Sequence, residues 1–285
     1  MAAAALMRRG TMMRLCCAAK ERALPIRVDN EPRINRTVID DDQLKKMLSS
    51  SKPSFLQQNK FRIVTLVLIA INVIVFAIEA VLAGFRVSIP TTVLVDMGAM
   101  YAPLIQSAAD LYRFVTPMFL HVDLMHLAFN MVALYSVGEV LERVLGRGNF
   151  LLLYFIGGIT GNVISYASSV FLPGQAVVSA GASTSVFALF VAVALLGLLH
   201  KGNRRYFSQY SKSMLSIIAI NVVYTFLVPS ISISGHLGGA LGGLIAMFMI
   251  PSKNLRVPVA VRVVVAVAWV ASLGWLAVSQ GIVGS

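Results

Sequence analysis

Ser183 and His236 could act together, the serine as a nucleophile and the histidine as its base. A serine hydroxyl is a weak nucleophile until a base takes its proton, and histidine is the usual partner. Ser183 lies in Gly-Ala-Ser-Thr-Ser at 181–185, where a loop is expected to become a helix. A helix N-terminus offers free backbone N–H groups that can stabilise an oxyanion. His236, in another apolar run, is the candidate base.

A second group of polar residues could supply hydrogen bonds to a developing negative charge. His126 and Asn130 are four residues apart, so on a helix they share one face. Both can donate hydrogen bonds, which is what an oxyanion hole requires. His121 lies five residues before His126, too far round the helix to share that face well, and we assign it a supporting or water-organising role.

Two other interpretations of these side chains stay open. They could form satisfied hydrogen bonds between helices without chemistry, or they could bind a transition metal. No cysteine accompanies the three histidines in the apolar runs, and we disfavour the metal. We therefore expect no metal and no cofactor.

The composition defines the elements that must position these residues. The 285-residue chain is 58% hydrophobic and 13% charged, with a mean hydropathy of +0.80, which predicts an all-α polytopic membrane protein. A spanning helix needs about 20 mostly apolar residues. Seven stretches qualify: 61–84, 119–141, 149–171, 181–199, 214–229, 235–250 and 258–280. Ionisable groups at membrane depth are costly, so a functional site is the default interpretation.

The formal charge of +12 is distributed in alternate loops rather than on one face, so it indicates membrane topology and not nucleic-acid binding. By the positive-inside rule these loops are cytoplasmic, which places the N-terminus inside and the C-terminus outside. Spans two, four and six then begin at the outer face, which brings all the candidate residues into the outer half of the membrane. The cytoplasmic basic residues are Lys52, Lys60, Arg62, Arg143, Arg147, Lys201, Arg204, Arg205, Lys212, Lys253, Arg256 and Arg262.

We predict three regions. Residues 1–60 hold half of the acidic residues and are expected to form a mobile cytosolic tail. Residues 61–250 form a six-span core, in which the connection 86–118 is too long for a turn and apolar enough to rest at the membrane interface. Residues 251–285 contain a cytosolic connection and a seventh span.

The N-terminal residues leave one alternative for localisation. The first 28 residues are basic and poor in acid, a pattern that a mitochondrial presequence would share. The chain's two cysteines, Cys16 and Cys17, lie in this segment, where free thiols are expected rather than a disulfide or a zinc site.

Small residues near His236 predict how the candidate pair could meet. Gly235, Gly239 and Gly243 form a stripe that lets span six approach another helix closely. We infer that span four packs there and brings His236 within reach of Ser183. The alternative is ordinary helix packing, with His236 only capping the helix. No acidic residue is present in spans four and six, which favours a Ser/His dyad without a third member.

Three motifs closely resemble the rhomboid intramembrane serine proteases, over residues 110–250. They are Tyr-Arg-Phe-Val-Thr-Pro-Met-Phe-Leu-His-Val-Asp-Leu-Met-His-Leu-Ala-Phe-Asn at 112–130, Gly-Ala-Ser at 181–183 and Gly-His-Leu-Gly-Gly at 235–239. The resemblance implies a six-helix core with Ser183 as nucleophile, His236 as general base, and His126 and Asn130 as oxyanion donors. It also matches His121 to a further family histidine, Arg113 to the Trp-Arg loop motif, and Glu142 with Gly146 to a Glu-x-x-x-Gly motif.

The sequence departs from the family pattern in three places. Thr184 replaces the glycine that commonly follows the nucleophile, Tyr112 replaces the usual tryptophan, and the extra span follows the core in a six-plus-one order. Mitochondrial members are typically one-plus-six, so a bacterial plasma membrane is expected, with the mitochondrial inner membrane as the alternative.

The resemblance implies an endopeptidase that cleaves transmembrane segments near their extracytoplasmic end. The expected partners are transmembrane protein substrates and the lipid bilayer, and the oligomeric state is left open. A non-catalytic rhomboid-like protein that recognises membrane helices would be expected to lack the serine or the histidine. A transporter would be expected to carry polar residues across the whole bilayer.

Overall fold

The computed structural model describes most of the chain beyond residue 58. The chain divides into two compact units, Met1–Lys52 and Pro53–Ser285. In the first unit only 40–43 are described, and 41–43 are helical, so the predicted tail falls almost wholly outside the described residues. The described ranges are 40–43, 59–172, 178–202, 204–213, 219–220, 223 and 232–283.

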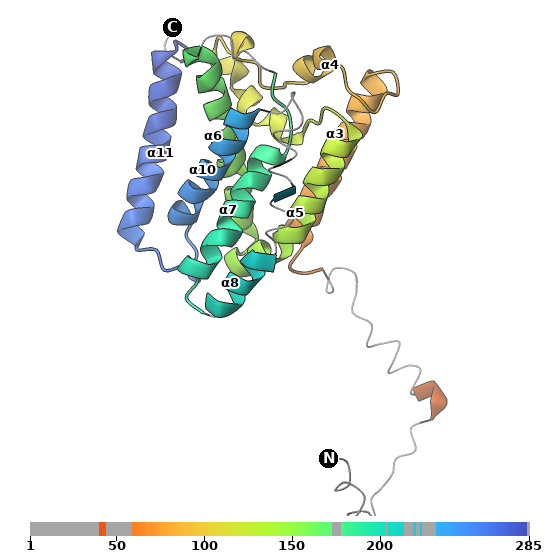
Figure 1. Cartoon of the computed structure of the whole chain (residues 1–285), viewed down its shortest axis with the longest axis vertical. Helices are drawn as coiled ribbons and strands as arrows, with labels where there is room; N and C mark the ends of the chain where they lie inside the picture. The colour runs from red at the N-terminus through yellow and green to blue at the C-terminus, as the bar shows by residue number, and fades with distance from the viewer. Residues whose placement is uncertain are drawn as a thin grey trace, which may run out of the picture. The chain divides into compact units, whose positions relative to one another are not determined.

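The second unit is a bundle of apolar helices (Figure 1), and the prediction of an all-α polytopic membrane protein is confirmed. Four described helices are long and apolar enough to span a membrane, and α7 and α10 are shorter apolar helices. Their bounds are α3 (Ile63–Leu82), α5 (Leu124–Leu145), α6 (Arg147–Phe171), α7 (Ser183–Leu199), α10 (Ile233–Met249) and α11 (Val259–Ser279). The expected span 214–229 lies outside the described residues, apart from positions 219, 220 and 223.

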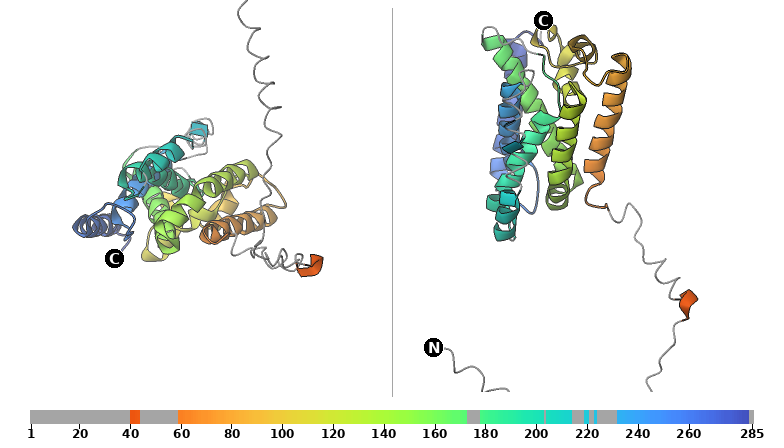
Figure 2. Two further views of the ribbon diagram at one scale, coloured as in Figure 1. Left: turned by 90° about the horizontal axis from the view of Figure 1, so that it is seen from below. Right: turned by 45° about the vertical axis from the view of Figure 1, so that its right-hand side comes forward.

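The helices α6, α7 and α10 pack together in the middle of the bundle, and α3 and α11 lie at its opposite edges (Figures 1 and 2). The largest buried cluster joins side chains of α5, α6, α7 and α10. In α11 only Leu276 is buried, as expected for a helix that faces lipid on most of its surface. The indole Nε1 of Trp269 donates a hydrogen bond of 3.0 Å to Oγ1 of Thr160 and so ties α11 to α6.

The long connection 86–118 consists of short helices at one end of the bundle, and α8 (Arg204–Ser213) lies at the other (Figure 1). It contains α4 (Thr91–Asp96) and the 3₁₀ helices η1 (Ala102–Leu104), η2 (Ala108–Phe114) and η3, which ends just beyond it (Thr116–Phe119). Arg113 donates from Nη1 to the carbonyls of Val95 and Ala99, at 2.9 and 3.0 Å. The amide of Asn162, on α6, donates to the Phe114 carbonyl at 2.9 Å. These bonds satisfy buried backbone groups and fix the connection on the bundle.

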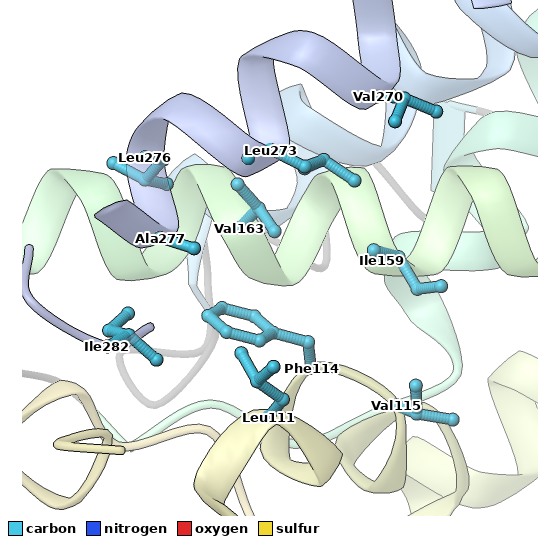
Figure 3. A pocket seen from close by; sticks show the side chains of 11 residues that line it. Leu111, Phe114, Val115, Ile159, Val163, Val270, Leu273, Leu276, Ala277 and Ile282 are labelled. Carbon is cyan, nitrogen blue, oxygen red and sulfur yellow. The ribbon is translucent and has the colours of Figure 1, made fainter. Parts of the chain in front are cut away.

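An apolar pocket of about 410 Å³ separates part of α11 from its neighbours (Figure 3). Leu111 and Phe114 extend into it from η2, opposite Val163 of α6 and Leu273 of α11. Almost no polar surface lines it. The lining comes from the loop, α6 and the end of the chain around α11, and it includes neither Ser183 nor His236.

Candidate active site

Ser183 and His236 lie at the first turns of α7 and α10. Ser183 is the first residue of α7, and His236 is in the first turn of α10. Nε2 of His236 lies 2.6 Å from Oγ of Ser183, across 53 residues of sequence, and both side chains are buried. At this separation the two atoms share one hydrogen, so a neutral imidazole protonated at Nδ1 can accept the serine proton.

Two glycines make this approach possible. Gly239 lies one turn after His236, and a Cβ added there would collide with the carbonyl oxygen of Thr184. The predicted close contact between the two helices is therefore present. Gly181 has a φ of +144°, and a Cβ there would lie 2.6 Å from Cε1 of His126. Only glycine combines that backbone conformation with so close a neighbour.

The ring of His236 is also oriented by its surroundings. It stacks on Phe187, with ring centroids 4.3 Å apart and planes inclined by 14°. Ser232 caps α10, because its Oγ accepts the backbone N–H of Gly235 at 3.0 Å. A stacked aromatic ring and a capped helix N-terminus together limit the motion of the imidazole. Neither Phe187 nor Ser232 was singled out from the sequence, because an apolar aromatic and a serine near a helix start are common.

The other donors lie on α5, and its beginning differs from the prediction. The helix begins at Leu124, not near 119, because Asp123 is its N-cap and accepts the backbone N–H of His126 at 2.8 Å. His121 therefore precedes the helix. Its ring lies beside that of His126, with centroids 5.4 Å apart, although a five-residue spacing on one helix would not place the two on a shared face. The capping signal was present in Asp123.

His126 and Asn130 are both buried on the face of α5 that points into the bundle. Nδ2 of Asn130 donates to the backbone carbonyl of His126 at 2.9 Å. The His126 ring lies against Gly181, two residues before Ser183. One side of the Ser183 hydroxyl is thus occupied by His236, and the ring of His126 on α5 lies near the loop that leads into α7.

The remaining residues of the predicted site hold helices and loops in place. Gly235 and Gly243 lie in the stripe of α10 that faces α7, where a Cβ on Gly243 would collide with the Ala188 carbonyl. Glu142 is buried at the far end of α5 and accepts the backbone N–H groups of Val64 and Thr65, each at 3.1 Å. Arg113 holds the long connection as described above. Neither Arg113 nor Glu142 contacts the serine and histidine pair by a described hydrogen bond.

Thr184, in place of the common glycine, fills space between helices next to Ser183. Its side chain packs against α6 and α10, where Cβ additions at Gly161 and Gly235 would lie 2.7 and 3.4 Å from Thr184 carbon atoms. The extra methyl and hydroxyl groups therefore fill space between helices. Glycine at 161 makes room for them.

Glu79 was not among the residues singled out from the sequence. It lies on α3, is fully buried, and accepts the backbone N–H of His121. The signal was available, because a carboxylate inside a span is as costly as the histidines that were singled out. Within the described part of the chain, no group of three or more His, Cys, Asp and Glu side chains is arranged to hold a metal ion.

Comparison with known proteins identifies a family for this chain. The family profile described as Rhomboid domain matches residues 108–253. Rhomboid protease GluP of Bacillus subtilis is 37% identical over 201 residues, covering 70% of this chain and 35% of that protein. The putative rhomboid protease YdcA of the same organism is 33% identical over 145 residues, covering 51% of this chain and 70% of that protein. Rhomboid-type serine protease 2 of Emericella nidulans is 32% identical over 136 residues, 47% of this chain and 25% of that protein.

The helices that are long and apolar enough to cross a membrane define the class as helical integral membrane proteins. Within that class, the chain belongs to the rhomboid family, whose domain covers more than half of it. It is an integral membrane protein. It spans about a third of the length of GluP and about 70% of YdcA.

Proposed function

We propose that this chain is an endopeptidase that hydrolyses peptide bonds in or near transmembrane segments of other proteins. The observation that carries the proposal is the distance of 2.6 Å between Nε2 of His236 and Oγ of Ser183. Ser183 is the nucleophile and His236 the general base. The family relationship supports a peptidase, and the buried position of the pair supports a substrate that reaches it from the bilayer.

The mechanism follows from the positions of these groups. As Oγ of Ser183 attacks the scissile carbonyl carbon, its proton passes to Nε2 of His236. The carbonyl oxygen becomes an oxyanion, for which the N-terminal N–H groups of α7, His126 and Asn130 are the donors. His236 then gives the proton to the leaving amine, and an acyl group remains on Ser183. Water, activated by the same histidine, releases it and restores the enzyme.

No acidic residue of α7 or α10 orients the imidazole, so the pair works as a dyad. The stack on Phe187 supplies the orientation that an aspartate gives in soluble triads. His121 supports His126 from the side, as the contact of their rings indicates.

The expected substrates are helices that unwind readily. A spanning helix hides its carbonyls in hydrogen bonds, so the segment must open locally before attack. Substrates should carry Gly, Ser or other helix-weakening residues near the outer boundary, with a small residue before the scissile bond. Cleavage mapped to the middle of a stable poly-leucine span would contradict this part of the proposal.

We further propose that the site faces the extracytoplasmic side. The basic residues Lys60 and Arg147 meet near the start of α3, and Lys201 and Arg256 meet after α7, at the end where α8 lies. By the positive-inside rule that end is cytoplasmic. A bacterial plasma membrane fits this orientation and the relatives from Bacillus subtilis. Single cysteines placed at 201 and 283 in a Cys16→Ser, Cys17→Ser background should react with impermeant reagents from opposite sides.

The test of the catalytic proposal is cleavage of a model transmembrane substrate by purified protein in detergent, followed by gel and mass spectrometry. Wild type should cut near the outer boundary, and Ser183→Ala and His236→Ala should each lose the product. Ser185→Ala is the matched control, because Ser185 is a buried serine on the same helix two residues further on. If folded wild type and both variants behave alike, the dyad assignment fails and a helix-binding role without catalysis takes its place.

A further inference from the structure

Glu79 is a carboxylate inside a membrane-spanning helix that the mechanism above does not use. It lies in the last turn of α3, with 0% of its surface exposed. An ionisable side chain at such a position is costly, so its retention calls for a specific partner. The partner identifies what the residue does.

Both carboxylate oxygens of Glu79 face one backbone donor. Oε1 and Oε2 lie 3.0 and 3.3 Å from the backbone nitrogen of His121, across 42 residues of sequence. Leu120, with a ψ of 150°, leaves η3 in extended backbone, so the N–H of His121 precedes α5 and belongs to no helix. Such a buried backbone donor needs an acceptor from elsewhere in the fold.

Other contacts fix the neighbours of His121 but not His121 itself. The N–H of Ile89 donates to the Val122 carbonyl at 2.9 Å, and the N–H of Leu124 donates to the Val87 carbonyl at 3.0 Å. These bonds hold the segment before α5 against the residues that follow α3. Glu79 adds the bond that holds the backbone of His121.

The fixed segment leads directly to the candidate site. The ring of His121 contacts that of His126 edge-on, at 5.4 Å between centroids. The ring of His126 in turn lies against Gly181, where a Cβ would be 3.0 Å from Nε2 of His126 and 3.1 Å from Oγ of Ser183. One continuous set of contacts therefore joins Glu79 to the space beside the nucleophile.

We propose that Glu79 is a positioning residue for catalysis: by accepting the backbone N–H of His121, it holds the His121 ring against His126 and so sets the oxyanion donor beside Ser183. This inference rests on the proposed function. In this role α3 contributes to catalysis, although it carries neither Ser183 nor His236. A purely structural role would instead make Glu79 a stabiliser of α3 packing with no effect on the rate of bond cleavage.

The substitutions Glu79→Gln and Glu79→Leu separate these roles. The amide oxygen of glutamine can still accept the His121 N–H, so Glu79→Gln should keep kcat within a few-fold of wild type. Leucine cannot accept it, and Glu79→Leu should lower kcat by about 10²-fold with little change in KM, as expected when an oxyanion donor is misplaced.

Thr65→Val is the matched control. Thr65 is also buried on α3 and loses a hydrogen bond to α5 when substituted, because its Oγ1 lies 3.1 Å from Glu142 at the opposite end of the helix. It should destabilise the protein without changing kcat. If Thr65→Val and Glu79→Leu lower kcat equally at equal loss of thermal stability, Glu79 is only structural and the proposal is overturned.

A second measurement follows the contact without using activity. The chain has four histidines, so selective ¹⁵N labelling gives at most four histidine backbone amide signals. Hydrogen exchange of the His121 amide should be slow in wild type and Glu79→Gln and fast in Glu79→Leu. Unchanged exchange in Glu79→Leu would overturn the inference. A folded wild type that shows the exchange pattern but cleaves no substrate would instead overturn the proposed function and the catalytic role with it.

Discussion

Gly239 of α10 lies directly against the backbone carbonyl of Thr184 on α7. Gly239 is one turn after His236 and Thr184 directly follows Ser183, so this backbone contact lies next to the serine and histidine pair. The distance between serine and histidine is therefore set by a contact between two helix backbones. Side-chain flexibility cannot compensate for a change in this contact, because the carbonyl is part of the first turn of α7.

Gly239→Ala should separate the two helices. The added Cβ would collide with the Thr184 carbonyl, so we expect a loss of roughly 1–3 kcal/mol in the free energy of unfolding. A displacement of the order of 1 Å at the dyad should reduce the cleavage rate about 10²-fold. Thermal unfolding and initial rates in detergent measure both effects. Gly274→Ala on α11, where a Cβ meets nothing within 4 Å, is the control and should change neither.

Thr184→Val should be tolerated or stabilising. Oγ1 of Thr184 is buried and has no hydrogen-bond partner among the described residues, and valine keeps the shape that fills the space beside Gly161. Removing the unsatisfied hydroxyl should raise the free energy of unfolding by about 1 kcal/mol, with the cleavage rate within twofold of wild type. A large loss of rate would mean that the hydroxyl acts on the substrate.

Trp269→Phe should loosen α11 without affecting catalysis. It removes the hydrogen bond from Nε1 to Oγ1 of Thr160, and hydrogen bonds between membrane helices are worth about 0.6 kcal/mol on average. The control is Trp275→Phe on the same helix, where the residue is 68% exposed. Unfolding measured in bicelles should show a lower stability for Trp269→Phe than for Trp275→Phe, while kcat should stay the same for both variants. Equal stability of the two variants would count against the tie to α6.

Acid should weaken the capping box at the start of η2, which Ser107 and Asp110 form. Hydrogen bonds from the Ser107 hydroxyl, and then from the Gln106 backbone, hold the pKa of Asp110 below its ordinary value of 3.8. A lowered carboxylate pKa contributes stability that is present above the unfolded pKa and is lost as the pH falls through the folded pKa. Hydrogen exchange of residues 106–114, corrected for intrinsic rates, should therefore lose protection below about pH 3.8.

Asp110→Asn is the control for that pH dependence. Asparagine cannot be ionised, so exchange of the same residues should be insensitive to pH across this window. Persisting pH dependence in Asp110→Asn would assign the transition to another group.

The sequence predicted the fold class well, because the cost of burying polar backbone in lipid forces long apolar runs to become helices. The described spans lie close to the predicted ranges, apart from α5. There the apolar run starting near 119 suggested a helix, but the Asp123 cap excludes the preceding residues. Hydropathy marks where a chain can enter the membrane, whereas a cap marks where its backbone begins to turn.

By itself, the sequence determined which side chains could do chemistry and which apolar runs carry them, because residue type and spacing are local properties. Only the tertiary structure decided that His121 lies beside His126, that Thr184 packs against α6 and α10, and that Glu79 holds the segment before α5. Glu79 and His121 are 42 positions apart, and the other two contacts depend on where a helix begins and on which neighbours pack against it. Such contacts depend on the steric fit of whole helices, which no local pattern contains.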